Sequence, residues 1–223
     1  MTEIDPSNDW SVKYRPTSMA EFAAPDYIAL HVETMLTKPP NSILIDGEFG
    51  NGKTTPARII ANSMTAHASD IMELNAASDT GIDNIRNIVK TSAFRPKGKR
   101  RVFIVDEAHG LSYQAINALL KPVEEPPGPV TWIFCSSESG KINRALITRA
   151  RRITLPAPDK KAVRARLVDI AAKEGIAKYT ALANADKTER KELIAAMATL
   201  ASRAQGFRSA VNNFQTLADV VAS

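Results

Sequence analysis

The segment GEFGNGKT, residues 47–54, combines glycines, a lysine and a hydroxyl at a spacing that suits phosphate binding. A short apolar run precedes it and a helical pattern follows, which is the context that a phosphate-binding loop requires. Glycines let backbone N–H groups surround a phosphate, and the following helix N-terminus adds a favourable dipole. We therefore predict that Lys53 neutralises the β- and γ-phosphates of ATP and that the Thr54 hydroxyl binds Mg²⁺. The predicted nucleotide contacts of the loop are Gly47, Glu48, Phe49, Gly50, Asn51, Gly52, Lys53, Thr54 and Thr55.

A second motif, VFIVDEAH at residues 102–109, is an apolar run that ends in two carboxylates. Asp106 is predicted to hold the Mg²⁺ through water, and Glu107 to polarise the attacking water as general base. An Asp-Glu pair after a strand can also be the N-cap of a helix, but the loop at 47–54 favours the catalytic interpretation. His109 is predicted to be a packing or supporting residue rather than a metal ligand, because no second His or Cys accompanies it.

The elements that must position these residues alternate along the first part of the chain. Apolar runs without polar alternation are typical of strands covered on both faces, and hence of a parallel sheet between helices. The predicted strands are residues 42–45, 101–106, 130–136 and 152–155, with a weaker candidate at 70–76. Helical patterns lie between them at 27–37, 53–67, 81–92 and 112–125. This order predicts an α/β fold with a parallel five-stranded sheet wrapped by helices.

The pattern changes after Pro156 and Pro158, where strand candidates cease. Three segments rich in Ala, Leu, Lys, Arg and Glu have helical spacing, at 159–175, 187–203 and 207–222. Asp186 and Glu189 have the spacing of a capping box for the middle helix. We predict one domain at 1–157 and a small three-helix domain at 158–223.

Composition limits the classes of protein to which the chain can belong. The single cysteine, Cys135, excludes an internal disulfide framework and a cysteine-rich zinc site. No apolar stretch reaches about 18 residues, so we expect no membrane span. The start MTEIDPSNDW lacks the basic and then apolar pattern of a signal peptide. A reducing, cytoplasmic location is therefore expected. The net charge of +5 permits nucleic-acid binding but does not argue for it alone.

Several ordered motifs together resemble the AAA+ clamp-loader ATPases: replication factor C small subunits, DNA polymerase III gamma/tau subunits and phage T4-type loader subunits. The resemblance extends over nearly the whole chain and is more specific than the phosphate-binding loop alone. It implies the P-loop AAA+ fold, with the three C-terminal helices as a lid domain. The segments that carry it are WSVKYRP (10–16), ELNAASDTGIDNIRNIV (73–89), VFIVDEAHGLSYQAINALLKPVEEPP (102–127), FCSSESGKINRALITRARRITL (134–155) and GFRSAVNNFQ (206–215).

The resemblance also implies roles for individual residues around the nucleotide. Ser137 falls at the first sensor, which contacts the γ-phosphate or the attacking water, and its neighbour Ser136 stays an alternative. Arg208 falls at the second sensor, which touches the γ-phosphate bound by its own subunit, although an exposed arginine at a helix start would look the same. The N-terminal box packs around the adenine, and its predicted contacts are Val12, Tyr14, Arg15 and Pro16.

An arginine that reaches the ATP of an adjacent subunit is implied at Arg149. The family has Ser-Arg-Cys here, whereas this chain has Thr148-Arg149-Ala150, which keeps the arginine and changes both flanks. An arginine that acts on an adjacent subunit needs only a guanidinium held by a rigid segment, so the changes at the two flanking residues do not remove the prediction. A surface ion pair is the alternative. Other arginines crowd the region, namely Arg144, Arg151 and Arg152.

DNA contacts are predicted for Arg86 and Lys90, which are four residues apart and so share one face of a helix. In the family, basic residues facing the centre of the ring follow the phosphates of a primed duplex, without reading sequence. A solvated helix face is the alternative. The densely basic run RPKGKRR, residues 95–101, is predicted to be an exposed turn.

The function implied is that of one ATPase subunit in a pentameric ring with other clamp-loader subunits, which opens a sliding clamp and places it on primer–template DNA. The expected cofactors are ATP and Mg²⁺, and the expected location is the cytoplasm of a bacterium or phage-infected host, or its nucleoid. Two alternatives stay open: an AAA+ motor for branch migration or helicase loading, and a non-hydrolysing structural ring subunit. The zinc-binding cysteines of the gamma subunit are absent. The family's collar domain is expected after the second domain, but this sequence stops at Ser223, either because the chain is trimmed or because the natural protein lacks the collar.

Overall fold

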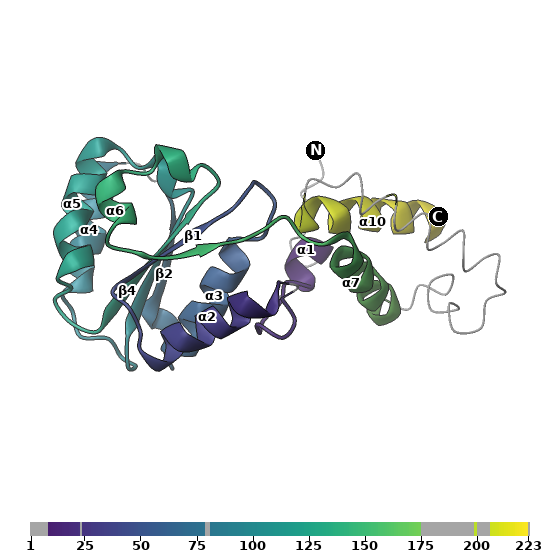
Figure 1. The fold of residues 1–223 in the computed structure, drawn as a ribbon, viewed down its shortest axis with the longest axis horizontal. Coiled ribbons are helices and arrows are strands. Elements are labelled where there is room, and N and C mark those ends of the chain that lie inside the picture. The colour runs from purple at the N-terminus through teal and green to yellow at the C-terminus, as the bar shows by residue number, and fades with distance from the viewer. Residues whose placement is uncertain (1–8, 23, 79–80, 175–198, 200–205, 223) are drawn as a thin grey trace. The chain divides into compact units, whose positions relative to one another are not determined.

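The computed structural model describes residues 9–22, 24–78, 81–174, 199 and 206–222. Its contacts divide the chain into two compact units. The larger unit, Thr17–Glu48 with Lys53–Pro156, contains the sheet, and the smaller unit comprises Met1–Pro16, Phe49–Gly52 and Ala157–Ser223. Figure 1 shows the strands and their covering helices in the first and the helical nature of the second. The boundary predicted at residue 157 stays a prediction.

The sheet has five parallel strands in the order β2-β3-β4-β1-β5. Their bounds are β1 Ser42–Asp46, β2 Ile71–Asn75, β3 Arg101–Asp106, β4 Val130–Ser136 and β5 Arg151–Thr154. The predicted parallel five-stranded α/β fold is therefore confirmed, including the weak candidate at 70–76. Because β1 and β3 both flank β4, the residues that follow these three strands meet at one edge of the sheet.

Helices cover both faces of the sheet. Figure 1 shows α2 and α3 on one side and α4, α5 and α6 on the other. Their bounds are α2 Asp26–Thr37, α3 Thr54–Met64, α4 Ile82–Ser92, α5 Tyr113–Glu124 and α6 Arg144–Ile147, with short 3₁₀ turns η2 Ala68–Asp70, η3 Ala108–Gly110 and η4 Ser139–Lys141. The predicted helices are confirmed, except that α3 ends three residues before the expected end at 67. Thr65 adopts an extended conformation there, which turns the chain toward η2 and β2.

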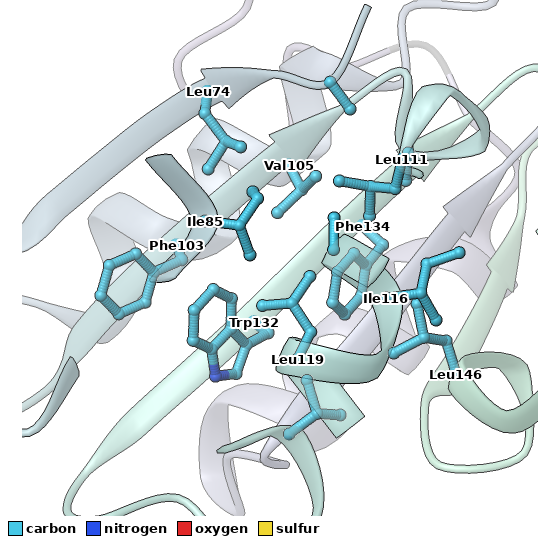
Figure 2. Close-up of a cluster of buried hydrophobic side chains, with 14 of the residues drawn as sticks. Leu74, Ile85, Phe103, Val105, Leu111, Ile116, Leu119, Trp132, Phe134 and Leu146 are labelled. Atoms are coloured by element: carbon cyan, nitrogen blue, oxygen red, sulfur yellow. The ribbon is translucent and has the colours of Figure 1, made fainter. Parts of the chain in front are cut away.

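The central strands are apolar along their whole length because successive side chains enter different cores. In β3, Phe103 and Val105 face the cluster under α4 and α5, whereas Val102 and Ile104 face the cluster under α2 and α3. Figure 2 shows the first cluster, where the rings of Phe103 and Trp132 stack with centroids 4.3 Å apart. Each such side chain stabilises the fold by roughly 1.5–3 kcal/mol on burial. The edge strands β2 and β5 are more exposed, which explains the weaker pattern of β2.

In the smaller unit, a helix from the N-terminal end of the chain packs with two helices from its C-terminal part. Trp10 belongs to α1, Trp10–Lys13, and its ring centroid lies 5.8 Å from that of Phe214 in α10, Phe207–Ala222. Leu167 of α7, Lys160–Lys173, joins the same core. The helices predicted at 159–175 and 207–222 are thus confirmed. The helix predicted at 187–203, with its capping box of Asp186 and Glu189, lies outside the described residues.

The basic run at 95–101 forms a turn whose last residue begins β3. This confirms the predicted turn, but Arg101 is buried rather than exposed. Its Nη2 lies 3.5 Å from Oδ1 of Asp70, which is fully buried and also accepts hydrogen bonds from the backbone N–H groups of Lys97 (3.0 Å) and Gly98 (2.6 Å). Burial would raise the pKa of Asp70, but these hydrogen bonds and the guanidinium outweigh it and lower the pKa.

We expect Asp70→Ala to lower the free energy of unfolding by about 3 kcal/mol at pH 7, because it leaves a buried arginine and two N–H groups without their carboxylate. Urea unfolding followed by tryptophan fluorescence measures this change. Since the folded-state pKa of Asp70 is lowered, its stabilisation is fully present above the unfolded-state pKa, about 4, and is lost as the pH falls through the folded-state value.

The matched control is Asp83→Ala, which removes an exposed carboxylate paired with Arg86. An exposed pair of this kind contributes at most about 1 kcal/mol. Equal losses for the two variants at pH 7, or an Asp70→Ala loss that persists unchanged at pH 3, would contradict the buried-pair account.

Within the described ranges, no helix is long and apolar enough to cross a membrane.

Candidate functional site

The predicted phosphate-binding loop lies directly between β1 and α3. It begins at the sheet edge, where the N–H of Gly47 donates to the carbonyl of Ser136 at the end of β4 (3.3 Å). Gly50 and Gly52 have φ angles of 83° and 75°, in the left-handed region that side chains other than glycine rarely adopt. Lys53 then takes helical angles as the N-cap of α3. The glycines therefore stand where the backbone conformation requires them, as the motif predicts.

Lys53 is buried, and its ammonium is held by the loop itself. Nζ donates to the carbonyl oxygens of Gly47 (3.1 Å) and Glu48 (2.9 Å). Behind it, the Cys135 thiol of β4 contacts the Lys53 carbonyl at 3.8 Å. Burial raises the pKa of Cys135 well above its ordinary value, so the thiol packs as a neutral group. The side chain thus lies along the predicted phosphate-binding loop, with its ammonium on two loop carbonyls.

The hydroxyl predicted to bind Mg²⁺ lies beside the carboxylate predicted to hold it. Thr54 Oγ1 donates to Asp106 Oδ2 at 2.8 Å, which joins the start of α3 to the end of β3. Hydroxyl and carboxylate oxygens suit Mg²⁺, which takes one or two protein ligands and completes its shell with water and phosphate oxygens. Among the residues that the structure describes, no group of three or more His, Cys, Asp or Glu could hold a metal without such help. The donor set therefore fits Mg²⁺ bound together with a nucleotide.

Glu107, the predicted general base, has an unusual backbone conformation. Its φ of 49° and ψ of 43° are left-handed, and it is the one non-glycine residue with positive φ in the described part of the chain. Its carboxylate Oε2 accepts a hydrogen bond from Ser137 Oγ at 3.0 Å. The structure thus brings together the predicted base and the predicted first sensor. Ser136, the alternative sensor, is fully buried and contacts His109 Nδ1 instead (3.3 Å).

The short turn η3 that follows Glu107 packs directly against the backbone after β2. A Cβ at Gly110 would approach the carbonyl oxygen of Ala76 to 2.9 Å, so only glycine fits without movement of the backbone. The N–H of Ala76 also donates to the Asp106 carbonyl at 2.8 Å. The backbone on both sides of Glu107 is therefore fixed to the neighbouring strand.

A carboxylate that sequence reasoning missed lies immediately before the loop. Asp46, at the end of β1, is buried and accepts two hydrogen bonds from Arg152 (2.9 and 2.6 Å) and one from Thr154 (3.0 Å). Burial would raise the pKa of Asp46, but these donors and the charge of Arg152 outweigh it and lower the pKa. The cluster ties β1 to β5 below the loop. The sequence signal that could have identified Asp46 is that it is an aspartate at the end of an apolar strand with no partner nearby in the sequence.

Arg149, predicted to act on a neighbouring subunit, lies between α6 and β5. Its Nε donates to Glu124 Oε2 (2.8 Å) and its Nη1 to the carbonyl of Ala145 (2.9 Å). Nη2 has no partner among the residues described here. The predicted alternative, a surface ion pair, is thus present, but it occupies only one side of the guanidinium. Of the other arginines in this region, Arg152 forms an ion pair with Asp46.

The remaining predicted nucleotide contacts lie in the smaller unit. The Tyr14 hydroxyl donates to Glu174 (2.6 Å), and the Tyr14 carbonyl accepts from Arg166 (2.6 Å). Burial raises the pKa of Tyr14, and the hydrogen bond to Glu174 adds to the rise. Val12 and Arg208 are exposed, and Arg15 and Pro16 are partly buried.

The two residues predicted to contact DNA share the exposed side of α4. Arg86 and Lys90 are exposed, whereas Ile85 and Ile88 of the same helix are buried. Arg86 pairs with Asp83 one turn earlier (3.4 Å), which is also highly exposed. Both side chains are accessible to the phosphates of DNA, and the same exposure is expected of a solvated helix face.

Comparisons with known proteins agree with the resemblance in the sequence. The family model described as DNA polymerase III, delta subunit, matches residues 68–159. The gamma/tau subunit of DNA polymerase III from Mycoplasma pneumoniae is 33% identical over 187 residues, covering 74% of this chain and 28% of the relative. The tau subunit from Escherichia coli is 28% identical over 189 residues, covering 74% and 29%. The chain therefore spans less than a third of the length of these relatives.

Solved structures show the same fold at lower identity. A RuvB variant from Thermotoga maritima superposes with a TM-score of 0.72 at 20% identity, covering 94% of this chain and 66% of that one. A gamma subunit-related protein of DNA polymerase III from the same organism gives a TM-score of 0.53 at 20% identity, with 85% and 71% covered. At this identity the likeness concerns the fold alone.

Proposed function

Since the chain belongs to the AAA+ clamp-loader family, we propose that it is an ATPase subunit of a sliding-clamp loader. It binds Mg²⁺ and ATP at the loop after β1, and it uses hydrolysis to open a clamp and place it on primer–template DNA during replication. The observation that supports this most strongly is the 2.8 Å contact between Thr54 and Asp106, because it joins the phosphate-binding loop to the acidic end of β3.

The proposed chemistry is attack of water on the γ-phosphorus. Lys53 compensates the charge of the β- and γ-phosphates, and Thr54 and Asp106 hold Mg²⁺. When bound, Mg²⁺ supplies charge neutralisation at the phosphate oxygens. Glu107 takes the proton of the attacking water as the new P–O bond forms, and the bond between the β-phosphate oxygen and the γ-phosphorus breaks to release ADP.

Other residues position the nucleotide in this proposal. Ser137, which follows β4, contacts the attacking water through its hydroxyl oxygen, because its single O–H is donated to Glu107 Oε2. The segment that contains Val12, Tyr14, Arg15 and Pro16 surrounds the adenine, and Arg208 contacts the γ-phosphate so that the lid domain responds to the nucleotide. These roles rest on the matching motif positions of the family.

Arg149 is proposed to act in an assembled ring, at the boundary with the adjacent subunit. Its guanidinium is held by Glu124 and Ala145 on one side, and its Nη2 has no partner among the described residues, which suits donation to a phosphate of the adjacent subunit. Arg86 and Lys90 contact the phosphates of the primed duplex in the same proposal, and such contacts weaken as salt rises.

We expect Arg149→Ala to reduce ATP hydrolysis by the assembled complex about 10³-fold, because it removes the charge that stabilises the transition state in trans. ATP binding to the isolated chain should stay unchanged, since the arginine serves a different subunit's nucleotide. Steady-state hydrolysis of the complex and fluorescence titration of the isolated chain measure the two quantities. The control is Arg144→Ala, an exposed arginine on α6. Equal turnover in the Arg149 variant and this control would rule out the trans role.

The proposed function is tested by measuring ATP hydrolysis with and without primed DNA and a cognate sliding clamp, using the full-length protein with the subunits that copurify with it. Stimulation by both, together with capture of the clamp in the presence of ATP, supports the loader. Hydrolysis without clamp capture would favour a motor for branch migration or helicase loading. Clamp capture without hydrolysis by this subunit would favour a structural ring subunit.

A further inference from the structure

His109 lies between two carboxylates at the carboxyl edge of the sheet. Its Nδ1 is 3.4 Å from Glu107 Oε2 and 3.3 Å from Ser136 Oγ, and its Nε2 is 3.6 Å from Glu138 Oε1. The imidazole is mostly buried, with 20% of its side chain exposed. Each ring nitrogen therefore faces a different glutamate, and one of these is the proposed general base.

The backbone at Glu107 needs support from its surroundings. A left-handed conformation costs a residue other than glycine about 1 kcal/mol or more, and it persists where neighbouring contacts hold it. The Glu107 carbonyl accepts from the N–H of Gly110 (2.8 Å), and its N–H donates to Asp106 Oδ1 (3.0 Å). The main chain is thus held on both sides, and the direction of the carboxylate depends on what the side chain contacts.

Those side-chain contacts converge on one oxygen. Ser137 Oγ donates to Oε2 of Glu107, and His109 Nδ1 faces the same Oε2. Oε1 has no partner within the described ranges. A general base needs one oxygen directed at the water, and anchoring the other oxygen restricts the rotation that would misdirect it.

The far side of the imidazole is anchored as well. Glu138 faces Nε2, and its other oxygen pairs with Lys141 Nζ at 2.5 Å. The N–H of Glu138 donates to Ser136 Oγ at 3.0 Å, which fixes the turn after β4. A continuous series of polar contacts therefore runs from Lys141 through Glu138 and His109 to Glu107, and it connects the turn after β4 to the turn after β3.

We propose that His109 is a positioning residue for Glu107, with Glu138 orienting the imidazole. The inference rests on the proposed ATPase function and adds to it the group that directs the base. His109 and Ser137 together hold Oε2 at the end of β4, so that Oε1 accepts the proton of the attacking water. His109 touches neither nucleotide nor water in this account.

Three substitutions at His109 test the proposal through kcat and KM for ATP in the complex described above. His109→Ala should lower kcat roughly tenfold, because small misplacements of a reacting group are costly, and leave KM within about twofold. His109→Asn, whose amide can reach the region of Nδ1, should restore most of kcat. His109→Gln, whose amide reaches the region of Nε2, should not. The matched control is His31→Ala, an exposed histidine on α2 that should behave as the unmodified protein.

A double substitution tests whether His109 and Ser137 hold the same oxygen, Oε2 of Glu107. Because His109 and Ser137 hold the same atom, His109→Ala with Ser137→Ala should lower kcat by less than the product of the two single effects. Independent, multiplying effects would contradict convergence on Oε2.

The outcomes separate this inference from the proposed function. If Glu107→Gln is inactive but His109→Ala has the kcat of His31→Ala, the positioning role is wrong and the ATPase proposal stands. A parallel change in kcat, KM and thermal stability, not rescued by Asn, would mean a purely structural role. Absence of hydrolysis by the unmodified complex would overturn the proposed function and this inference with it.

Discussion

Lys53→Ala is expected to weaken ATP binding at least about a hundredfold. The ammonium of Lys53 is the one positive side chain of the predicted phosphate-binding loop, residues 47–54, and hydrogen bonds to charged groups contribute about 1.5–3 kcal/mol each. In the proposed complex the ammonium interacts with oxygens of both the β- and γ-phosphates. Titration with a fluorescent ATP analogue in the presence of Mg²⁺ measures the dissociation constant directly, without any need for turnover.

The loss should concern binding and not folding. Among the described residues, Nζ is hydrogen-bonded only to the Gly47 and Glu48 carbonyls of its own loop, so its removal leaves the two cores of the sheet intact. We expect the thermal midpoint without nucleotide to shift by only a few degrees. Lys121→Ala on α5 removes an exposed lysine and should bind ATP as the unmodified chain does. A Lys53→Ala chain that still bound ATP with unchanged affinity would show that the loop is not the phosphate site.

Much of this site was predictable because parallel strands bring distant residues to one edge. The apolar runs at β1, β3 and β4 indicated buried strands, and parallel order then placed the loop after β1 near the carboxylates after β3. The contact of Thr54 with Asp106 needs no knowledge of side-chain packing beyond that order. Motifs joined to strand ends are therefore the part of a site that sequence specifies best.

The contacts that escaped prediction depend on how segments far apart in the sequence pack. Nothing near His109 in sequence indicates that Glu138, beyond the next strand, faces its imidazole. Asp46 and Arg152 are joined only because β1 and β5 are neighbours in the sheet. Trp10 likewise reaches α10, where its backbone N–H donates to Oε1 of Gln215, 205 positions along the chain. Each of these pairs is a consequence of tertiary packing, which local spacing does not encode.

The left-handed backbone of Glu107 also lay beyond sequence reasoning, because a glutamate has no preference for that region. This backbone conformation gives the two acidic residues of the motif different directions. Asp106 ends a regular strand and points at Thr54, whereas the turn at Glu107 directs its side chain to Ser137 instead. Adjacent carboxylates thus reach different partners, which is the arrangement that a metal ligand and a general base require.

Glu107→Gln is expected to keep ATP binding and to reduce hydrolysis at least about a hundredfold, because general base catalysis contributes on the order of 10²–10⁴ in rate. The amide has the size of the carboxylate and can still accept the hydrogen bond from Ser137 through its oxygen, so the turn after β3 should keep its geometry. Single-turnover hydrolysis at saturating ATP measures the chemical step, and the titration used for Lys53→Ala measures binding.

Glu33→Gln, on the exposed side of α2, is the control for loss of one carboxylate and should hydrolyse ATP normally. Retained turnover in Glu107→Gln would remove the general base from the proposed mechanism, and equal loss of binding and turnover would point to a role in holding the nucleotide. The two central variants should therefore fail differently: Lys53→Ala before the nucleotide binds, and Glu107→Gln after it has bound. That difference is the sharpest test that the turns after β1 and β3 divide binding and chemistry between them.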